Sequence, residues 1–212
     1  MSRIDHEAMW TARYRDAGEE YVFGTAPNGF LARHAGLFEQ GRSALSVADG
    51  EGRNSVWLAE QGLRVTATEI SPVALEKARK LAAGRHVAVD FVLADALSWA
   101  YPESAFDFVV AIFVQFATPE ERAVLFDGMK KALRPGGLLV LQGYTPKQLE
   151  YRTGGPSALS HLYTPDMLRE AFADLHMLHL EEYEDVLDEG LGHRGRSALV
   201  GMIARKPAAA AA

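Results

Sequence analysis

A short glycine turn after an apolar run constrains this chain most. The segment that begins at Ala44 reads ALSVADGEGRN, and its apolar part ends at a turn that contains Gly50 and Gly52. Glycine lets the backbone bend sharply and approach a ligand closely, and the helix that follows offers free N–H groups in its first turn. The pattern predicts the first strand, turn and helix of a Rossmann-like fold.

The charges of this turn limit the kind of ligand it can hold. Asp49 and Glu51 flank Gly50 and would repel the pyrophosphate that dinucleotide folds place there. The third glycine of the dinucleotide fingerprint is also absent, because Ser55 stands in its place. A cationic ligand would instead be attracted. S-adenosylmethionine carries a sulfonium and an ammonium group and no phosphate, so we expect Asp49, Gly50, Glu51 and Gly52 to bind it.

A second carboxylate lies at the spacing that this fold requires. The apolar segment at 63–70 contains Glu69 near its end, 19 residues after Gly50. A carboxylate about 20 residues past the glycine turn, at the tip of the second strand, accepts hydrogen bonds from a ribose diol. Glu69 is therefore predicted to bind the ribose of the cofactor.

Composition excludes several classes of protein. With 212 residues and 48% hydrophobic content, the chain can bury one core. The net charge of −6 argues against nucleic acid as a partner and favours a small molecule. The absence of cysteine excludes disulfides and thiolate ligands. No stretch resembles a signal core or a membrane span, so we expect a cytoplasmic protein that does not bind membranes.

Short apolar runs alternate with amphipathic segments along the chain, which predicts parallel strands joined by helices. Strands are expected near 43–49, 64–70, 87–94, 106–113 and 138–144, with helices at 53–61, 72–83 and 119–133. After a helix at about 165–173, two strands near 176–186 and 196–204 flank a hairpin turn at 188–192. The expected fold is α/β, Rossmann-like and doubly wound, with a seven-stranded, mostly parallel sheet and an antiparallel C-terminal hairpin.

We expect one domain over residues 1–206, followed by a disordered tail at 207–212. Within it, residues 1–42 form an N-terminal helical cap and residues 43–206 the core, with a Gly-rich segment at 144–163 as a lid or a long connection. Aromatic residues of the cap either cover the cofactor or pack the first helix onto the sheet: Trp10, Tyr14, Tyr21 and Phe23.

Three segments carry a family resemblance: GEGRNSVWLAEQG at 50–62, Arg-Pro-Gly-Gly at 134–137 and Met-Ile-Ala-Arg-Lys at 202–206. From Trp10 to Lys206 the chain resembles a class I S-adenosylmethionine-dependent methyltransferase, and most of all the small tellurite-resistance and thiopurine-type enzymes. Two positions depart from the first motif of that family, since Ser46 replaces its opening acid and Ala48 its first glycine. Asp49 would supply the displaced carboxylate.

The resemblance implies further cofactor contacts. Asp95 would accept the adenine amino group, beside the backbone N–H of Ala96, or would act only as an acidic turn cap. Ile70 would pack on adenine, and Asn54 lies in the matching first helix. Residues 111–116 would line the methionine part, with Ala111, Phe113 and Gln115 as contacts. The product would be S-adenosylhomocysteine.

The resemblance also points to a basic cluster in the last hairpin as the catalytic and acceptor-binding group: His193, Arg194 and Arg196. Such a cluster binds an oxyanion or a carboxylate, or is an ordinary solvated hairpin tip. His193 is the best candidate base in the chain, or is an ordinary surface histidine. Gln115 cannot take a proton, which favours positioning of the acceptor over proton abstraction. Arg152 of the 144–163 segment either closes over the acceptor or only keeps a loop soluble.

No metal site is expected, because His176 and His179 would point to opposite faces of a strand. The predicted activity is in-line methyl transfer to a small acceptor such as a chalcogen oxyanion or a thiol, by a monomer or a homodimer. Two alternatives remain: a nicotinamide-dependent reductase, and a catalytically silent module that only binds the cofactor.

Overall fold

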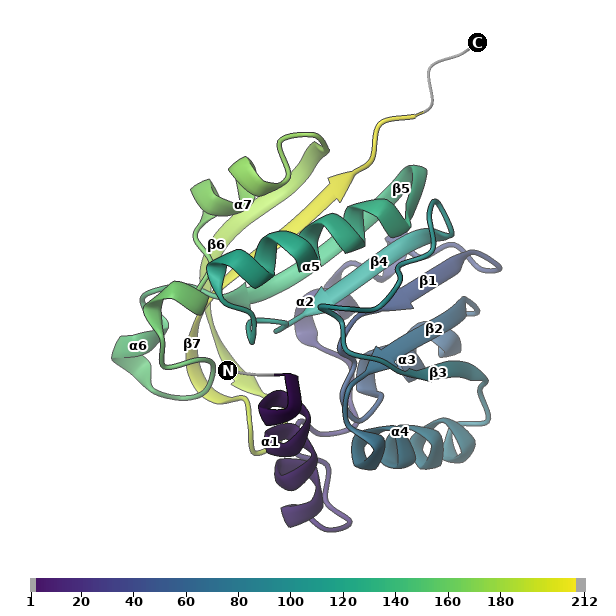
Figure 1. Cartoon of the computed structure of the whole chain (residues 1–212), viewed down its shortest axis with the longest axis vertical. Helices are drawn as coiled ribbons and strands as arrows, with labels where there is room; N and C mark the ends of the chain where they lie inside the picture. The colour runs from purple at the N-terminus through teal and green to yellow at the C-terminus, as the bar shows by residue number, and fades with distance from the viewer. Residues whose placement is uncertain (1–2, 209–212) are drawn as a thin grey trace. The chain divides into compact units, whose positions relative to one another are not determined.

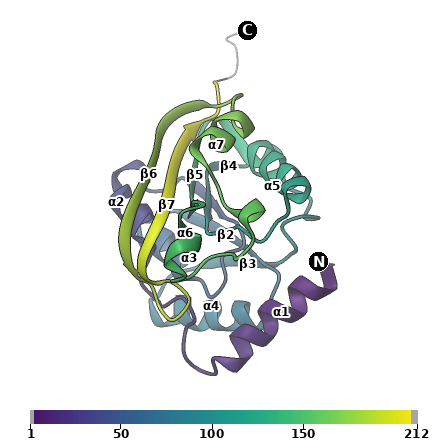
Figure 2. The same ribbon diagram turned by 90° about the vertical axis from the view of Figure 1, so that its left-hand side faces the viewer.

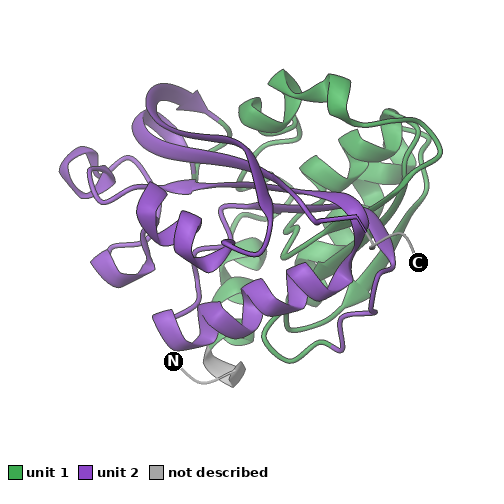
Figure 3. Cartoon of the chain, turned by 90° about the horizontal axis from the view of Figure 1, so that it is seen from above, with its two compact units in different colours: residues 1–99, 189–192 green, residues 100–188, 193–212 purple. Residues whose placement is uncertain are grey.

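The computed structural model describes residues 3–208, so part of the tail predicted at 207–212 lies outside the described residues. The chain divides into two compact units (Figure 3). Unit 1 comprises residues 1–99 and 189–192, and unit 2 comprises residues 100–188 and 193–212. The tip of the C-terminal hairpin therefore belongs to the same unit as the N-terminal segment.

Seven strands form a mixed sheet in the order β3-β2-β1-β4-β5-β7-β6 (Figure 1). The pairs β1–β2, β2–β3 and β4–β5 are parallel, whereas β5–β7 and β6–β7 are antiparallel. The predicted fold class, mostly parallel with an antiparallel C-terminal hairpin, is confirmed.

Over its described residues, 3–99 and 189–192, unit 1 holds three strands and four helices. The strands are β1 (Ser43–Ser46), β2 (Arg64–Glu69) and β3 (Val89–Leu93), and the helices are α1 (Arg3–Asp16), α2 (Gly29–Arg33), α3 (Arg53–Glu60) and α4 (Pro72–Gly84), with a short 3-10 turn η1 at Ala35–Leu37. Helix α4 begins as its sequence dictates, because Ser71 accepts a hydrogen bond from Ala74 N and Pro72 occupies the first turn. Helices α1 and α4 lie side by side (Figure 1).

Unit 2 holds the remaining four strands. They are β4 (Phe106–Ile112), β5 (Leu133–Tyr144), β6 (His176–Asp188) and β7 (Arg194–Arg205), accompanied by α5 (Pro119–Ala132), α6 (Gln148–Tyr151), α7 (Pro165–Ala171) and the 3-10 turn η2 (Leu159–His161). Strands β4 and β5 contain the apolar runs 108–112 and 138–141, as strands buried on both faces require. Figure 2 shows β6 and β7 as long neighbouring ribbons.

One strand begins earlier than the sequence predicted. Strand β5 was expected at 138–144, but it pairs from Leu133, which lies opposite Phe106. The register then shifts, so that Phe108 lies opposite Leu138. The Arg-Pro-Gly-Gly turn at 134–137 is therefore an irregularity inside the strand, because Pro lacks an N–H for the ladder and Gly136 has a φ of +82°.

The segment at 144–163 lies along β7. The side chain of Gln148, which is 1% exposed, accepts a hydrogen bond from Ala198 N and donates to Thr153 Oγ1. Gly154 and His193 form an isolated antiparallel bridge. These contacts give the segment a fixed course within unit 2. Arg152 is exposed there with a φ of +54°.

Candidate functional site

Two glycines shape the turn between β1 and α3 in unit 1. Gly50 and Gly52 have φ angles of +65° and +92°, which residues with side chains rarely adopt. A Cβ atom on Gly52 would lie 2.8 Å from the Cβ atom of Ala78 on α4. Backbone angle and lack of space therefore both require glycine in this turn.

Asp49 ties the turn to the start of α3. Its carboxylate accepts hydrogen bonds from Ser46 Oγ at 2.6 Å, from Ser55 N at 3.2 Å and from the Ser55 hydroxyl. It thus acts as the capping side chain that the N-cap residue Gly52 lacks. Burial raises the pKa of Asp49, and the bonds from Ser46 and Ser55 oppose this rise. Ser46, which replaces the family's opening acid, binds the carboxylate that stands three residues later.

Glu69 joins the end of β2 to the same turn. Its Oε2 atom accepts a hydrogen bond from Gly50 N at 2.9 Å, and its Oε1 atom accepts one from Ser71 N at 2.9 Å. Burial raises the pKa of Glu69 to about 7, although the bonds from Ser71 and Gly50 lower it. Since a carboxylate has about four lone-pair positions, Glu69 can hold the turn and still accept hydrogen bonds from a ligand.

Glu51 has a different role from the one its charge suggested. Its Oε1 atom lies 2.9 Å from Lys77 Nζ, and both side chains are almost fully buried. Lys77 also donates to the carbonyl oxygen of Glu20, and Glu51 accepts a weak bond from Phe23 N. The expectation that Glu51 presents an uncompensated negative charge to the ligand was therefore wrong, because a lysine neutralises it. The negative charge at the turn comes from Asp49 and Glu69.

Asn54 supports the N-terminal segment. Its Oδ1 atom accepts a hydrogen bond from Asn28 N at 2.9 Å. Asn28 in turn caps α2 through Leu31 N and donates to Glu189, whose other partners are Gly29 N and Arg53 Nη1. The amide of Asn54 thus contributes to the framework of unit 1, and its predicted contact with the cofactor stays a prediction.

Aromatic residues of α1 and the following loop pack together beside the turn. Trp10 stacks on Tyr14 with 5.8 Å between ring centroids, and Phe23 meets the Tyr14 ring edge-on at 6.3 Å. The guanidinium of Arg13 lies 5.0 Å from the centre of the Phe23 ring. Tyr21 donates its hydroxyl hydrogen bond to the carbonyl oxygen of Lys77. The group packs α1 onto α4.

The predicted adenine-binding residues lie after β2 and β3. Asp95 is 8% exposed and accepts hydrogen bonds from Leu97 N at 3.0 Å and from the Ser98 hydroxyl at 3.4 Å. Asp95 thus acts as an acidic cap of the turn, which is the second of the two roles expected from the sequence. Ala96 is buried and Ile70 is half-buried. Their contacts with adenine stay predictions.

The end of β4, in unit 2, carries the residues predicted to line the methionine part. Ala111 is fully buried, and Phe113 has a φ of +56°, an unusual angle for a bulky residue. The side-chain amide of Gln115 forms all its hydrogen bonds inside unit 2. Its oxygen accepts one from Tyr144 N at 2.5 Å, and its nitrogen donates to the carbonyl oxygens of Tyr144 and His161. The side chain of Gln115 therefore holds the backbone at Tyr144 and His161 in place. Its predicted contact with the cofactor stays a prediction.

His193 is buried in an aromatic cluster of unit 2. Its Nδ1 atom lies 2.5 Å from the hydroxyl oxygen of Tyr144, and its ring stacks on Phe113 with 4.2 Å between centroids. Phe113 and Tyr144 also stack, at 4.6 Å. A buried imidazole with a fixed hydrogen bond has a defined orientation, which a base requires.

The structure does not bring Arg194 and Arg196 together with His193. Strand alternation sends the two arginines to solvent, where Arg194 lies 3.7 Å from Asp188 and Arg196 forms bonds of 2.9 and 2.6 Å with Glu184. Their guanidinium groups already bind carboxylates. The predicted basic cluster is therefore one buried histidine and two exposed ion pairs.

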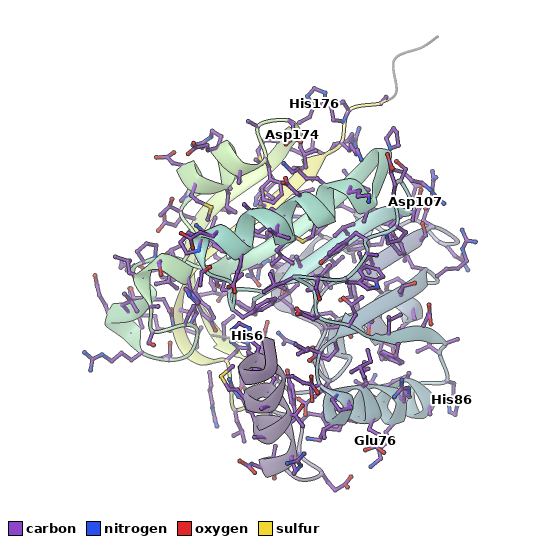
Figure 4. All side chains as sticks on the ribbon, viewed as in Figure 1. His6, Glu76, His86, Asp107, Asp174 and His176 are labelled. Carbon is purple, nitrogen blue, oxygen red and sulfur yellow. The ribbon has the colours of Figure 1, made fainter. Side chains whose placement is uncertain are left out.

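Over the described residues, 3–208, no group of three or more His, Asp or Glu side chains could hold a metal ion. His176 is exposed at the start of β6 (Figure 4), and His179 lies 3.6 Å from Glu181. No helix in this part of the chain has the length and apolar character needed to cross a bilayer.

Residues 44–137 match the family model described as a methyltransferase domain. Over this range the chain is similar to a methyltransferase domain. The matched range begins in β1, contains the glycine turn and Glu69, and ends at the Arg-Pro-Gly-Gly irregularity of β5. The family resemblance drawn from the glycine turn is confirmed, and it supports S-adenosylmethionine as the expected cofactor.

Relatives of this chain include longer proteins. An uncharacterized protein of Mycobacterium tuberculosis (strain ATCC 25618 / H37Rv) is 30% identical over 142 residues, which cover 66% of this chain and 50% of the relative. The chain spans about half the length of the curated relatives it matches first. TehB from Haemophilus influenzae has a similar structure, with a TM-score of 0.70 and 20% identity over 93% of this chain and 67% of that chain.

A second structure, from work on the conversion of a disulfide bond into a thioacetal group during echinomycin biosynthesis, has a TM-score of 0.75. It is 20% identical and covers 95% of this chain and 92% of that chain. At these identities both structures show the fold alone, which this chain shares over most of its length.

Sequence reasoning missed three residues that hold the site. Lys77 neutralises Glu51, Glu189 binds the N-terminal segment, and Tyr144 orients His193. Only Tyr144 carried a local signal, since it ends the apolar run of β5 just as Glu69 ends that of β2. The other two are surface residue types on an amphipathic helix and a hairpin tip.

Proposed function

We propose that the chain is an S-adenosylmethionine-dependent methyltransferase that methylates a small-molecule acceptor. The observation that carries this proposal is the hydrogen bond from Gly50 N to Glu69, which joins the glycine turn to a carboxylate at the ends of two parallel strands. A carboxylate at this place would bind a ribose diol. The match of residues 44–137 to the methyltransferase domain supports it.

Methyl transfer needs little chemistry from the protein. S-adenosylmethionine held by the glycine turn and Glu69 would supply an activated methyl group. A lone pair of the acceptor would bond to the methyl carbon as the bond from carbon to sulfur broke, and the sulfonium would leave as a neutral thioether. The cation is thus present before the reaction and absent after it. Asp49 and Glu69 favour the charged cofactor over its neutral-sulfur product, which assists product release.

We assign the acceptor to the aromatic cluster of unit 2 that contains Phe113, Tyr144 and His193. An acceptor that arrives protonated, such as a thiol or a hydroxyl, gives its proton to the imidazole of His193, which Tyr144 holds in one orientation. An anionic chalcogen acceptor needs no base. The resemblance of the sequence to the tellurite-resistance and thiopurine-type enzymes makes a soft chalcogen or sulfur acceptor the first class to test.

Calorimetric titration with S-adenosylmethionine and S-adenosylhomocysteine tests the cofactor. We expect micromolar binding of both by the wild-type chain, strong loss in E69Q and unchanged binding in E184Q, which alters an exposed glutamate of unit 2. No heat with either ligand contradicts the proposal. Tight binding of NADH instead would support the nicotinamide-dependent alternative.

A product assay with labelled methyl donor tests the acceptor, using selenide, thiols and phenols in turn. We expect turnover with at least one acceptor, and a steep loss in H193Q for protonated acceptors but not for selenide. H179Q, which changes a half-exposed histidine, is the matched control. Bound cofactor without turnover across the whole panel would favour the silent binding module.

A further inference from the structure

Tyr14 of α1 places its hydroxyl group on the glycine turn. The side chain is 3% exposed, and its oxygen lies 3.0 Å from the position that a Cβ atom on Gly50 would take. Stacking on Trp10 and edge contact with Phe23 hold the ring in this position. The turn therefore has a hydroxyl group over the same glycine whose N–H binds Glu69.

This hydroxyl differs from the hydroxyls of two other tyrosines, the half-buried Tyr21 and the buried Tyr163. Tyr21 donates to the carbonyl oxygen of Lys77 at 3.0 Å, and the buried Tyr163 donates to the carbonyl oxygen of Val114 at 3.3 Å. Among the residues that the structure describes, Tyr14 Oη has no hydrogen-bond partner. Tyr14 Oη is also not one of the fully enclosed side-chain atoms that lack a partner, so its oxygen can be reached and is available to a ligand.

The charges around the hydroxyl decide what kind of ligand group it meets. Burial raises the pKa of Tyr14 well above its ordinary value, and Glu69, Glu51 and Asp49 raise it further, against a smaller opposing effect of Arg13. The phenol is thus neutral and lies in a negative potential. Such a position favours a cationic hydrogen-bond donor and disfavours a carboxylate.

We propose that Tyr14 is a cofactor-binding residue whose hydroxyl oxygen accepts a hydrogen bond from the ammonium group of the methionine part of S-adenosylmethionine. The inference rests on the proposed function, because it concerns the same cofactor. It gives the N-terminal helix a role in recognising the amino-acid part, whereas Glu69 recognises the ribose. Tyr14 thereby selects nucleosides that carry an amino group on their tail.

Calorimetric titration of Y14F tests the assignment with two probes. The first is S-adenosylhomocysteine, and the second is its analogue with hydrogen in place of the amino group. Hydrogen bonds to charged groups are strong enough that Y14F should bind S-adenosylhomocysteine about tenfold more weakly than wild type. Its affinity for the deaminated analogue should equal that of wild type.

Y21F is the matched control, since it removes a hydroxyl group that has a protein partner. We expect Y21F to unfold at a lower temperature and to bind S-adenosylhomocysteine as wild type does, and Y14F without ligand to unfold at or above the wild-type temperature. Equal affinity of Y14F and wild type for S-adenosylhomocysteine overturns the assignment, as does an equal loss for both probes. Failure of wild type to bind either probe overturns the proposed function, and the role of Tyr14 with it.

Discussion

Glu69 and Glu184 are the same side chain in opposite settings. Glu69 of unit 1 is buried and binds neutral backbone N–H groups, and burial raises its pKa to about 7. Glu184 of unit 2 is bonded to Lys147 and Arg196 at the surface, and these bonds lower its pKa to about 2. A carboxylate held by amides can respond to a cationic ligand, whereas one held by two cations is already neutralised.

The same contrast between a buried and an exposed carboxylate applies to two lysines, Lys77 beside Glu51 and Lys147 beside Glu184. Their substitution should have the largest effect on the free energy of unfolding. K77M would leave Glu51 buried and unpaired, which costs about 3–5 kcal/mol. K147M removes an exposed partner of Glu184 and should leave the unfolding midpoint almost unchanged. Urea unfolding of both variants measures the difference, and the double variant E51Q/K77M should recover much of the loss. Equal midpoints for K77M and K147M would contradict the burial argument.

The two glutamates should also respond to pH in opposite windows. The pKa of Glu69 is about 7 in the native state against 4.5 ordinarily, so the native state holds more protons between these values. The free energy of unfolding should therefore fall by about 3 kcal/mol as pH rises from 4.5 to 7, and this fall should be absent in E69Q.

For Glu184 the sign is reversed. Its lowered pKa means that its contribution is present above pH 4.5 and is lost as pH falls toward 2, so E184Q should differ from wild type in pH dependence only in that acidic range. Urea unfolding of wild type, E69Q and E184Q across both windows separates the two. Parallel profiles of wild type and E69Q between pH 4.5 and 7 would remove the basis of the comparison.

The smallest expected effect concerns backbone angles in the two regions. Ala48 of the glycine turn and Arg152 of the exposed segment at 144–163 have φ angles of +48° and +54°. A48G and R152G should each raise the free energy of unfolding by about 0.5–1 kcal/mol, because glycine relieves the left-handed conformation at some cost in chain entropy. Thermal unfolding measures both, and a loss of stability in A48G would show that its methyl group packs usefully.

The sequence predicted the elements whose signals are local. The glycine turn, the Ser71-Pro72 and Thr118-Pro119 helix starts and the hairpin each depend on neighbouring residues, and alternating apolar runs were sufficient for the mostly parallel sheet. The predicted start of β5 was wrong because the proline and glycines at 134–137 are typical of a turn. In the structure the strand already pairs with β4 before them, and they form an irregularity inside it.

The site was predictable only in part, because its partners are distant in sequence. Glu51 and Lys77 are 26 residues apart, and Tyr144 and His193 are 49 apart. Neither spacing leaves a periodic pattern. The charge of Glu51 could be read from the sequence, but its neutralisation could not, and the same holds for the arginines at 194 and 196.

The bonds of Glu189 have a consequence for how the molecule is made. This residue binds Asn28 and Gly29, which lie 161 and 160 positions earlier in the chain, and it pairs with Arg53. During translation the amino-terminal portion emerges first, yet its final polar contacts must wait until the hairpin tip has left the ribosome. A nascent chain stalled before residue 189 would therefore present an incomplete cap, open to proteases and chaperones.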